Sequence, residues 1–138
     1  MDNDSNWSSM SKTPSLSTMM DNIVVHEPEL NAMNDWNGFN IHRFFDDAGR
    51  KQGMSLVTMF VVKELGLCDH SHLNTTKLAM FLGRIYKGYR RSVEYHNDIH
   101  GADVLQVAYY FLTKGNLITL TEANELDLIS IITASICH

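Results

Sequence analysis

The sequence predicts an all-α fold, and two observations support that prediction. From Phe39 to Cys137, apolar residues recur at spacings of three and four, which place them on one side of an α-helix. The chain also lacks the alternation of polar and apolar residues that is typical of half-buried strands. With 138 residues, of which 44% are hydrophobic, the chain can form one packed domain.

The first part of the chain gives no clear helical signal. Residues 1–32 are rich in Ser, Asn, Asp, Thr and Met and have no sustained apolar period. Such a composition buries too little apolar surface to offset the entropy of ordering, so we expect a disordered or loosely attached leader. The helical domain is then expected over residues 33–138.

Two helices are expected next. The first covers Phe39 to Ala48, where Gly49 can end it, and Trp36 just before it is expected in the core. Ser55 can cap a second helix, which Gly66 ends. The apolar residues on one side of each helix are Ile41, Phe44, Phe45 and Ala48 in the first, and Leu56, Met59, Phe60 and Leu65 in the second.

The third and fourth helices have clear start signals. Asn74 can cap the third, and the fourth is expected from Asn97 to Thr113, before the breakers Gly115 and Asn116. The third helix carries a regular apolar stripe, which predicts that one of its faces packs on the core. That stripe consists of Leu78, Phe81, Leu82, Ile85, Tyr86 and Tyr89.

A fifth helix is expected at the end of the sequence. It can begin at Thr119 or Thr121, and Thr119 with Glu122 has the spacing of a capping box. Residues 126–137 are apolar on almost every side, which is typical of a helix buried all round in a larger domain. Further helices would be needed to cover it, so we expect the bundle in this chain to be incomplete, with apolar faces that could support a dimer.

Composition excludes several classes of protein. A net charge of −5 argues against a nucleic-acid-binding protein, which usually carries a basic face. No apolar run approaches the ~20 residues needed to span a bilayer, and no signal peptide is visible. Cys68 and Cys137 lack the spacing of a metal or disulfide framework, so we expect buried free thiols and a cytoplasmic location.

Histidines carry the main chemical signal. His96 and His100 are four residues apart, which puts both imidazoles on one helical face, and Asp103 on that face could orient one of them. If the fourth and fifth helices pack antiparallel, His138 returns to the same end. A pair at this spacing is more often structural than metal-binding, so the spacing alone does not decide. Four histidines lack a helical partner of this kind: His26, His42, and the loop residues His70 and His72.

A longer sequence match favours a functional role for these histidines over a structural one. Residues 95–106 read YHNDIHGADVLQ, which resembles the Tyr-His-Asn-x-x-His-Ala-x-Asp-Val-x-Gln segment of class I cyclic-nucleotide phosphodiesterases. The helices before it, and residues 128–138 after it, are also similar to that family. The resemblance covers residues 33–138 and implies a helical bundle of the HD-like type. Gly101 departs from the Ala usual in the family and is expected to loosen the helix.

The resemblance implies a role for each matched residue. His96 resembles the general acid that protonates the departing ribose oxygen, and His100 and His138 resemble ligands of a tightly held zinc ion. Tyr95 and Asn97 resemble residues of the pocket wall near the phosphate. The implied cofactors are a divalent metal pair, zinc with magnesium or manganese.

The activity implied is hydrolysis of 3′,5′-cyclic nucleotides, cyclic AMP or cyclic GMP or both, to 5′-nucleoside monophosphates. The family's site also uses two aspartates that have no counterpart in these residues. Two histidine ligands are too few for a closed zinc site, so we expect the 138 residues alone to bind zinc weakly and to be inactive.

Three other interpretations remain open at this point. The chain could be a non-catalytic product that regulates a full-length relative through its fifth helix. It could be another metallohydrolase of the His-Asp helical type, although Tyr95 and Asn97 favour the cyclic-nucleotide pattern. It could also be a bundle with purely structural histidines, which leaves the twelve-residue match unexplained. The choice between cyclic AMP and cyclic GMP and the oligomeric state are not predicted.

Overall fold

The computed structural model describes residues 15–68, 73–90 and 92–138, and these residues form helices and no strand, which confirms the all-α prediction. No described helix is both long enough and apolar enough to cross a membrane. In chain order the helices are α1 (Leu16–Val25), α2 (Glu27–Asn31), the 3-10 helix η2 (Ala32–Asn34), α3 (Ile41–Ala48), α4 (Arg50–Glu64), α5 (Thr75–Gly88), α6 (Asp98–Thr113), α7 (Leu117–Thr121) and α8 (Glu125–Ile136).

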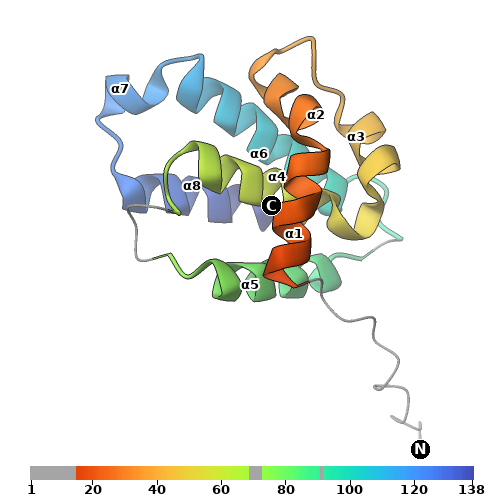
Figure 1. The fold of residues 1–138 in the computed structure, drawn as a ribbon. Coiled ribbons are helices and arrows are strands. Elements are labelled where there is room, and N and C mark those ends of the chain that lie inside the picture. Colours follow the sequence, from red (N-terminus) through yellow and green to blue (C-terminus); the bar gives the residue numbers. More distant parts are fainter. Residues whose placement is uncertain (1–14, 69–72, 91) are drawn as a thin grey trace, which may run out of the picture.

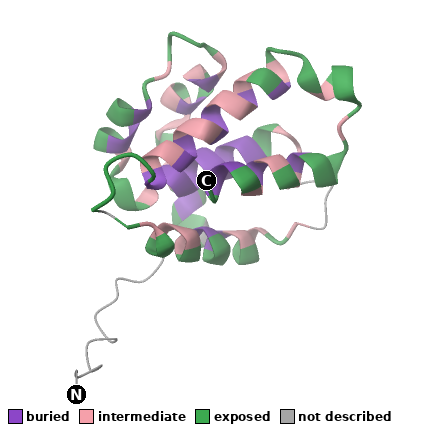
Figure 2. Ribbon diagram, turned by 180° about the vertical axis from the view of Figure 1, so that it is seen from behind, coloured by how far each residue is buried: buried purple, intermediate pink, exposed green. Residues whose placement is uncertain are grey.

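Helix α4 lies at the centre of the bundle, with α1, α3, α5, α6 and α8 packed around it (Figure 1). Ten consecutive residues of α4, 53–62, are buried, and the burial colours in Figure 2 show this continuous buried segment inside the bundle. A helix buried on all sides shows no polar face, so its limits are hard to predict from periodicity.

The start of α4 differs from the prediction. The predicted cap Ser55 is wrong, because this residue is buried inside the helix at 4% exposure. Gly49 is the boundary instead: with φ of +83° it ends α3 and directly precedes the first residue of α4. That conformation is open to glycine and strained for other residues, so one glycine makes the corner between two helices.

Helices α1 and α2 lie within the segment predicted as a disordered or loosely attached leader. Ser15 caps α1 by accepting a hydrogen bond from the Thr18 amide, and Met19, Ile23 and Leu30 are at most 2% exposed. Their order comes from packing of α1 against α4 and α5, which local composition does not reveal. The rest of the predicted leader, residues 1–14, lies outside the described residues.

Two expectations about burial are wrong. Trp36 is 56% exposed and packs its ring against Tyr110, with ring centroids 5.3 Å apart, on the outside of the bundle. Cys137 is exposed because it caps the free end of α8, whereas Cys68 is partly buried. An apolar or aromatic residue near a helix end can pack against its neighbours while much of its own surface stays exposed to solvent.

Helix α6 joins the centre of the bundle to α8. Its buried residues Ala102, Leu105, Tyr109 and Leu112 recur at three and four, and the facing residues of α8 are Leu128, Ile132 and Ile136. The predicted limits of α6, from about Asn97 to about Thr113, are confirmed, and the structure shows that Asn97 is its cap. Asn74 is likewise confirmed as the cap of α5.

The start of the last helix is a second correction. The predicted capping box of Thr119 and Glu122 is wrong, because Thr119 lies inside the short α7 and Glu122 ends it with φ of +53°. Asn124 and Asp127 form the capping box that starts α8. Helix α8 is also covered on one side only, and Leu126 is 71% exposed.

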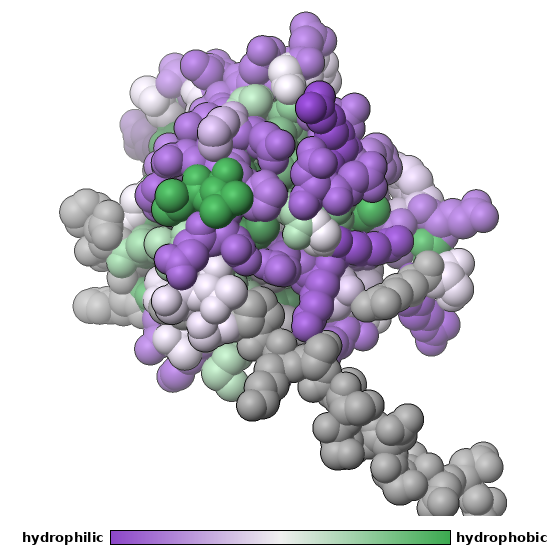
Figure 3. Space-filling model, turned by 45° about the vertical axis from the view of Figure 1, so that its right-hand side comes forward, coloured by the Kyte–Doolittle hydropathy of each residue, from purple (hydrophilic) through white to green (hydrophobic). Residues whose placement is uncertain are grey.

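Elsewhere on the surface, the face in Figure 3 is mostly hydrophilic around one compact apolar patch.

The central packing gives a first prediction. Leu105 of α6 is 0% exposed, so Leu105→Ala is expected to lower the free energy of unfolding by about 2–5 kcal/mol, through lost burial and a residual cavity. Leu126→Ala, the same change at an exposed helical position, is the control and is expected to alter it by less than about 0.5 kcal/mol. Equal effects of the two changes in urea unfolding would contradict the described packing.

Candidate functional site

Three histidines from two ends of the chain segment 95–138 meet at one point. His96 precedes α6, His100 lies in its first turn and His138 follows the end of α8. One ring nitrogen of each lies within 4.8 Å of those of the other two. The ring centroids are 5.1 Å apart for His100 and His138, and 5.6 Å for His96 and His138. Helix α8 therefore runs back along α6, which is the condition under which the sequence placed His138 near the other two histidines, and brings His138 to the start of α6.

Asn97 holds the start of α6 in place. Its side-chain oxygen accepts hydrogen bonds from the amides of Ile99 at 3.0 Å and His100 at 3.1 Å. Its side-chain nitrogen donates to the carbonyls of Val93 at 3.3 Å and Glu94 at 2.9 Å. Asn97 is 8% exposed, and these four bonds use both donors and both acceptor positions of the amide. Asn97 thus fixes the backbone that carries His96 and His100.

Asp98 adds a second anchor, which was not predicted from the sequence. It is 2% exposed and accepts hydrogen bonds from Arg50, at 2.9 Å from Nη2 and 3.2 Å from Nε. The hydrogen bond to Asp98 raises the pKa of the Arg50 guanidinium. Arg50 begins α4, so this pair ties the start of α6 to the start of the central helix. An acid in a first helical turn looks ordinary in a sequence, and its partner is 48 residues away.

Tyr95 covers one side of the histidine group. It is 65% exposed, and its ring centroid lies 4.2 Å from that of His100, with the planes tilted by 35°. It also contacts His96 edge to face, at 5.0 Å. Asp103, which was expected to orient an imidazole, is partly buried and forms no hydrogen bond or ion pair with a histidine among the described residues.

The other histidines stay apart from this group. His26 is a partner of Glu29, with Nδ1 3.1 Å from the carboxylate, and His42 is exposed on α3. His70 and His72, predicted to lie in a surface loop, fall outside the described residues. Among the residues that the structure describes, only His96, His100 and His138 form such a group.

Tyr89 contacts the end of α8 that carries His138. It follows α5, and its hydroxyl donates a hydrogen bond of 2.8 Å to the carbonyl of Ile136. Burial raises the pKa of Tyr89, so the hydroxyl stays protonated and remains a donor at neutral pH. From the sequence Tyr89 was placed only in an apolar stripe, because nothing local shows where its hydroxyl leads.

The donor set suits a zinc ion. Zinc binds imidazole nitrogen readily, and three histidines that leave a fourth position open are typical of catalytic zinc sites. In a tetrahedral zinc site the ligand nitrogens are about 3.3 Å apart, from zinc–nitrogen distances of ~2.0–2.1 Å. The exposed rings of His96 and His138 can close the remaining gap by rotating. No carboxylate belongs to the group among the described residues, so it offers little to magnesium, which prefers oxygen.

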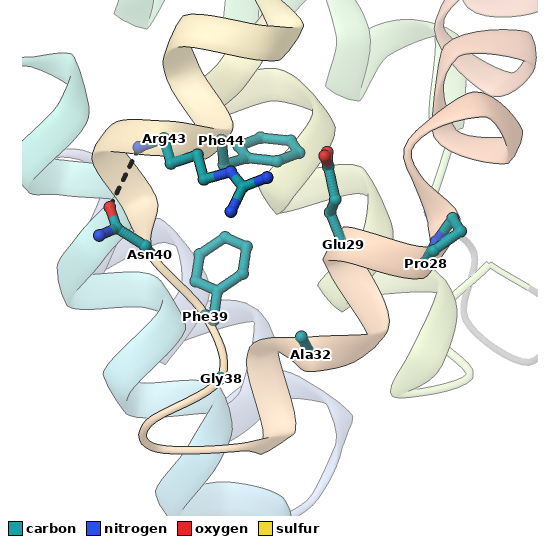
Figure 4. A pocket seen from close by; sticks show the side chains of 8 residues that line it. All are labelled: Pro28, Glu29, Ala32, Gly38, Phe39, Asn40, Arg43 and Phe44. Carbon is teal, nitrogen blue, oxygen red and sulfur yellow. Dashed lines mark hydrogen bonds between the residues drawn. The ribbon is translucent and has the colours of Figure 1, made fainter.

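A separate open pocket of about 320 Å³ lies between α2 and α3. Figure 4 shows the aromatic rings of Phe39 and Phe44 beside the guanidinium of Arg43, with Glu29 across the opening. None of the three converging histidines lines it, so the pocket is not part of the candidate metal site.

The cap at Asn97 gives a second prediction. Asn97→Ala is expected to lower the free energy of unfolding by about 1–2 kcal/mol, because the first amides of α6 lose their acceptor. Asn97→Asp keeps the acceptor for those amides but replaces the donor to the Val93 and Glu94 carbonyls by an oxygen, so it is expected to lower the free energy of unfolding by a comparable amount. Both are measured by urea unfolding, with histidine ring NMR signals recorded in parallel.

The control for this prediction is Asn74→Ala, which removes the cap of α5. A comparable loss of stability is expected there, with the signals of His96 and His100 unchanged. If Asn97→Ala leaves these two signals in place, Asn97 does not position them.

Comparison with known proteins supports the same interpretation. Residues 95–138 match the sequence profile of the 3′5′-cyclic nucleotide phosphodiesterase family. The cGMP-inhibited 3′,5′-cyclic phosphodiesterase 3A of Mus musculus is 30% identical over 98 residues, which cover 70% of this chain and 8% of that protein. The rod cGMP-specific 3′,5′-cyclic phosphodiesterase subunit alpha of Bos taurus is 35% identical over 75 residues, 54% of this chain and 8% of that protein.

The chain thus spans about 8% of the length of these relatives. No solved structure matches it significantly. The family match covers the segment in which the three histidines converge, and the similarity to phosphodiesterase 3A covers 70% of the chain. On these grounds the chain belongs to the 3′,5′-cyclic nucleotide phosphodiesterase family.

Proposed function

We propose that the protein contributes to hydrolysis of 3′,5′-cyclic nucleotides, cyclic AMP or cyclic GMP or both, to 5′-nucleoside monophosphates. In this proposal His100 and His138 bind a zinc ion, and His96 is the general acid. The observation that supports it is the convergence of three imidazoles within 4.8 Å, at a place built by the segment that matches the family.

The positions of the histidines suit different tasks. His100 is in the first turn of α6, where the Asn97 cap holds its backbone, and such a fixed position is what a metal ligand needs. His96 lies on the exposed segment before the helix, where its ring can approach a substrate from solvent. Breaking the cyclic phosphodiester leaves a negatively charged ribose oxygen, and a positioned imidazolium can donate a proton to it. Proton transfer of this kind typically contributes about 100-fold to 10,000-fold to the rate.

When bound, a zinc ion paired with magnesium or manganese supplies positive charge that polarises the phosphoryl oxygens.

The remaining predicted site residues fit this arrangement in different ways. Tyr95 presents an exposed ring beside His96 and His100, so it can form a wall of a substrate site. The proposed role of Asn97 near the phosphate would have to be indirect, through the backbone that it holds, because its amide is already fully hydrogen-bonded.

Metal titration tests the assignment of ligands. We expect His100→Ala and His138→Ala to weaken zinc binding by the 138-residue chain at least about tenfold, because each removes one ligand. His96→Ala is expected to weaken it less than about threefold, since a general acid does not bind the ion. Competition against a coloured chelator measures all three, and His42→Ala, at an exposed position on α3, is the control.

The outcomes separate two arrangements. An equal loss in all three variants would mean that His96 is a third ligand, and the proposed acid would be wrong. Zinc binding that none of the three changes would overturn the candidate metal site altogether.

The catalytic role is tested by the transcript beyond the codon for His138. In the family that residues 128–138 resemble, the matching histidine is followed by Asp-x-x-His-x-Gly. We expect the transcript to continue in this way, and the aspartate would supply the carboxylate that the three-histidine group lacks. The translated product is then assayed for hydrolysis of cyclic AMP and cyclic GMP, with its His96→Ala variant as the control. A stop codon directly after His138 would contradict catalysis and favour a non-catalytic binding partner.

A further inference from the structure

We infer that Tyr89 is a positioning residue for His138, and that the glycine at position 101 is required for it to act. The inference rests on the proposed function in so far as His138 binds a metal ion. It assigns a role to a residue outside the segment that matches the family, and it gives a structural reason for Gly101.

The end of α8 has few bonds of its own. The last four carbonyls of a helix have no partner within it, so the last turn depends on bonds from outside. The Cys137 amide donates to the carbonyl of Thr133 at 3.1 Å, and the His138 amide donates to that of Ser135 at 3.3 Å. The carbonyl of Ile136 receives the Tyr89 hydroxyl at 2.8 Å. Among the hydrogen bonds of the described residues, this one ties the turn before His138 to the residue that follows α5.

Gly101 leaves the space through which Tyr89 reaches that carbonyl. It is buried in α6, next to His100, and a Cβ atom there would lie 2.7 Å from the Tyr89 hydroxyl oxygen and 3.5 Å from the Ile136 carbonyl oxygen. The Tyr89 ring is partly buried and its hydroxyl is bonded to the Ile136 carbonyl, so moving the hydroxyl aside would disturb that bond. A side chain at position 101 would therefore push the end of α8 away from α6, and His138 away from His100.

Helix propensity alone predicts the opposite effect at position 101. An alanine in a helix is more favourable than a glycine, so Gly101→Ala would stabilise α6 if space were available. With the hydroxyl removed, the nearest atom of the ring, Cζ, would lie 3.4 Å from the new Cβ, which is an ordinary contact. Whether Gly101→Ala raises or lowers the melting temperature should therefore depend on whether residue 89 carries a hydroxyl group.

Four forms of the 138-residue chain test this: wild type, Tyr89→Phe, Gly101→Ala and the double variant. Zinc affinity is measured by chelator competition and the melting temperature is measured without metal. We expect Tyr89→Phe and Gly101→Ala each to weaken zinc binding about tenfold or more, as for other residues that orient metal ligands. We expect Gly101→Ala to lower the melting temperature of the wild type and to raise that of Tyr89→Phe. Gly88→Ala, at a helical glycine with nothing within 4 Å of the added Cβ, is the control and should leave zinc affinity unchanged.

The two readouts keep the inference separate from the proposed function. If the wild type does not bind zinc, the proposed metal site fails, while the reversal in melting temperature still tests the contact between Tyr89 and Gly101. If the wild type binds zinc and Tyr89→Phe retains its affinity within twofold, the positioning role is overturned. If Gly101→Ala lowers the melting temperature equally in both backgrounds, or neither single nor double variant folds, the steric role of Gly101 is overturned.

Discussion

The burial of α4 on every side is the constraint on which the rest of the structure depends. Ten consecutive residues of this helix are removed from water, so helices from both halves of the chain must pack around it. Arg50, at its first turn, is only partly covered and pairs with the buried Asp98, which sets where α6 begins. The position of the candidate site thus follows from the need to cover one central helix.

The site itself is built where helices end. Amides at the start of a helix and carbonyls at its end lack partners within the helix, and other groups must satisfy them. Asn97 does so at the start of α6, and Tyr89 does so at the end of α8. Because His100 and His138 stand beside these two points, the bonds that complete the helices also place the imidazoles.

Sequence patterns predicted those parts that depend on neighbouring residues. Asn74 was identified as a cap, and Asn97 as the approximate start of α6, because these signals lie within a few residues of the helix start. The placement of His96 and His100 on one helical face also followed from their spacing, whereas the return of His138 depended on the packing of α8 against α6. The limits of α4 and the order of α1 were not predictable in this way, because packing against distant helices determines them. The Arg50–Asp98 and Tyr89–Ile136 contacts, 48 and 47 residues apart in sequence, were missed for the same reason.

The one-sided cover of α8 has a consequence for the lifetime of the protein. A helix that is packed on one side and exposed on the other opens more readily than the centre of a bundle, and a protease can then cut it. An ion held between α6 and α8 binds only while α8 is docked, so by mass action it would oppose this opening, by about 2.7 kcal/mol at a hundred times its dissociation constant.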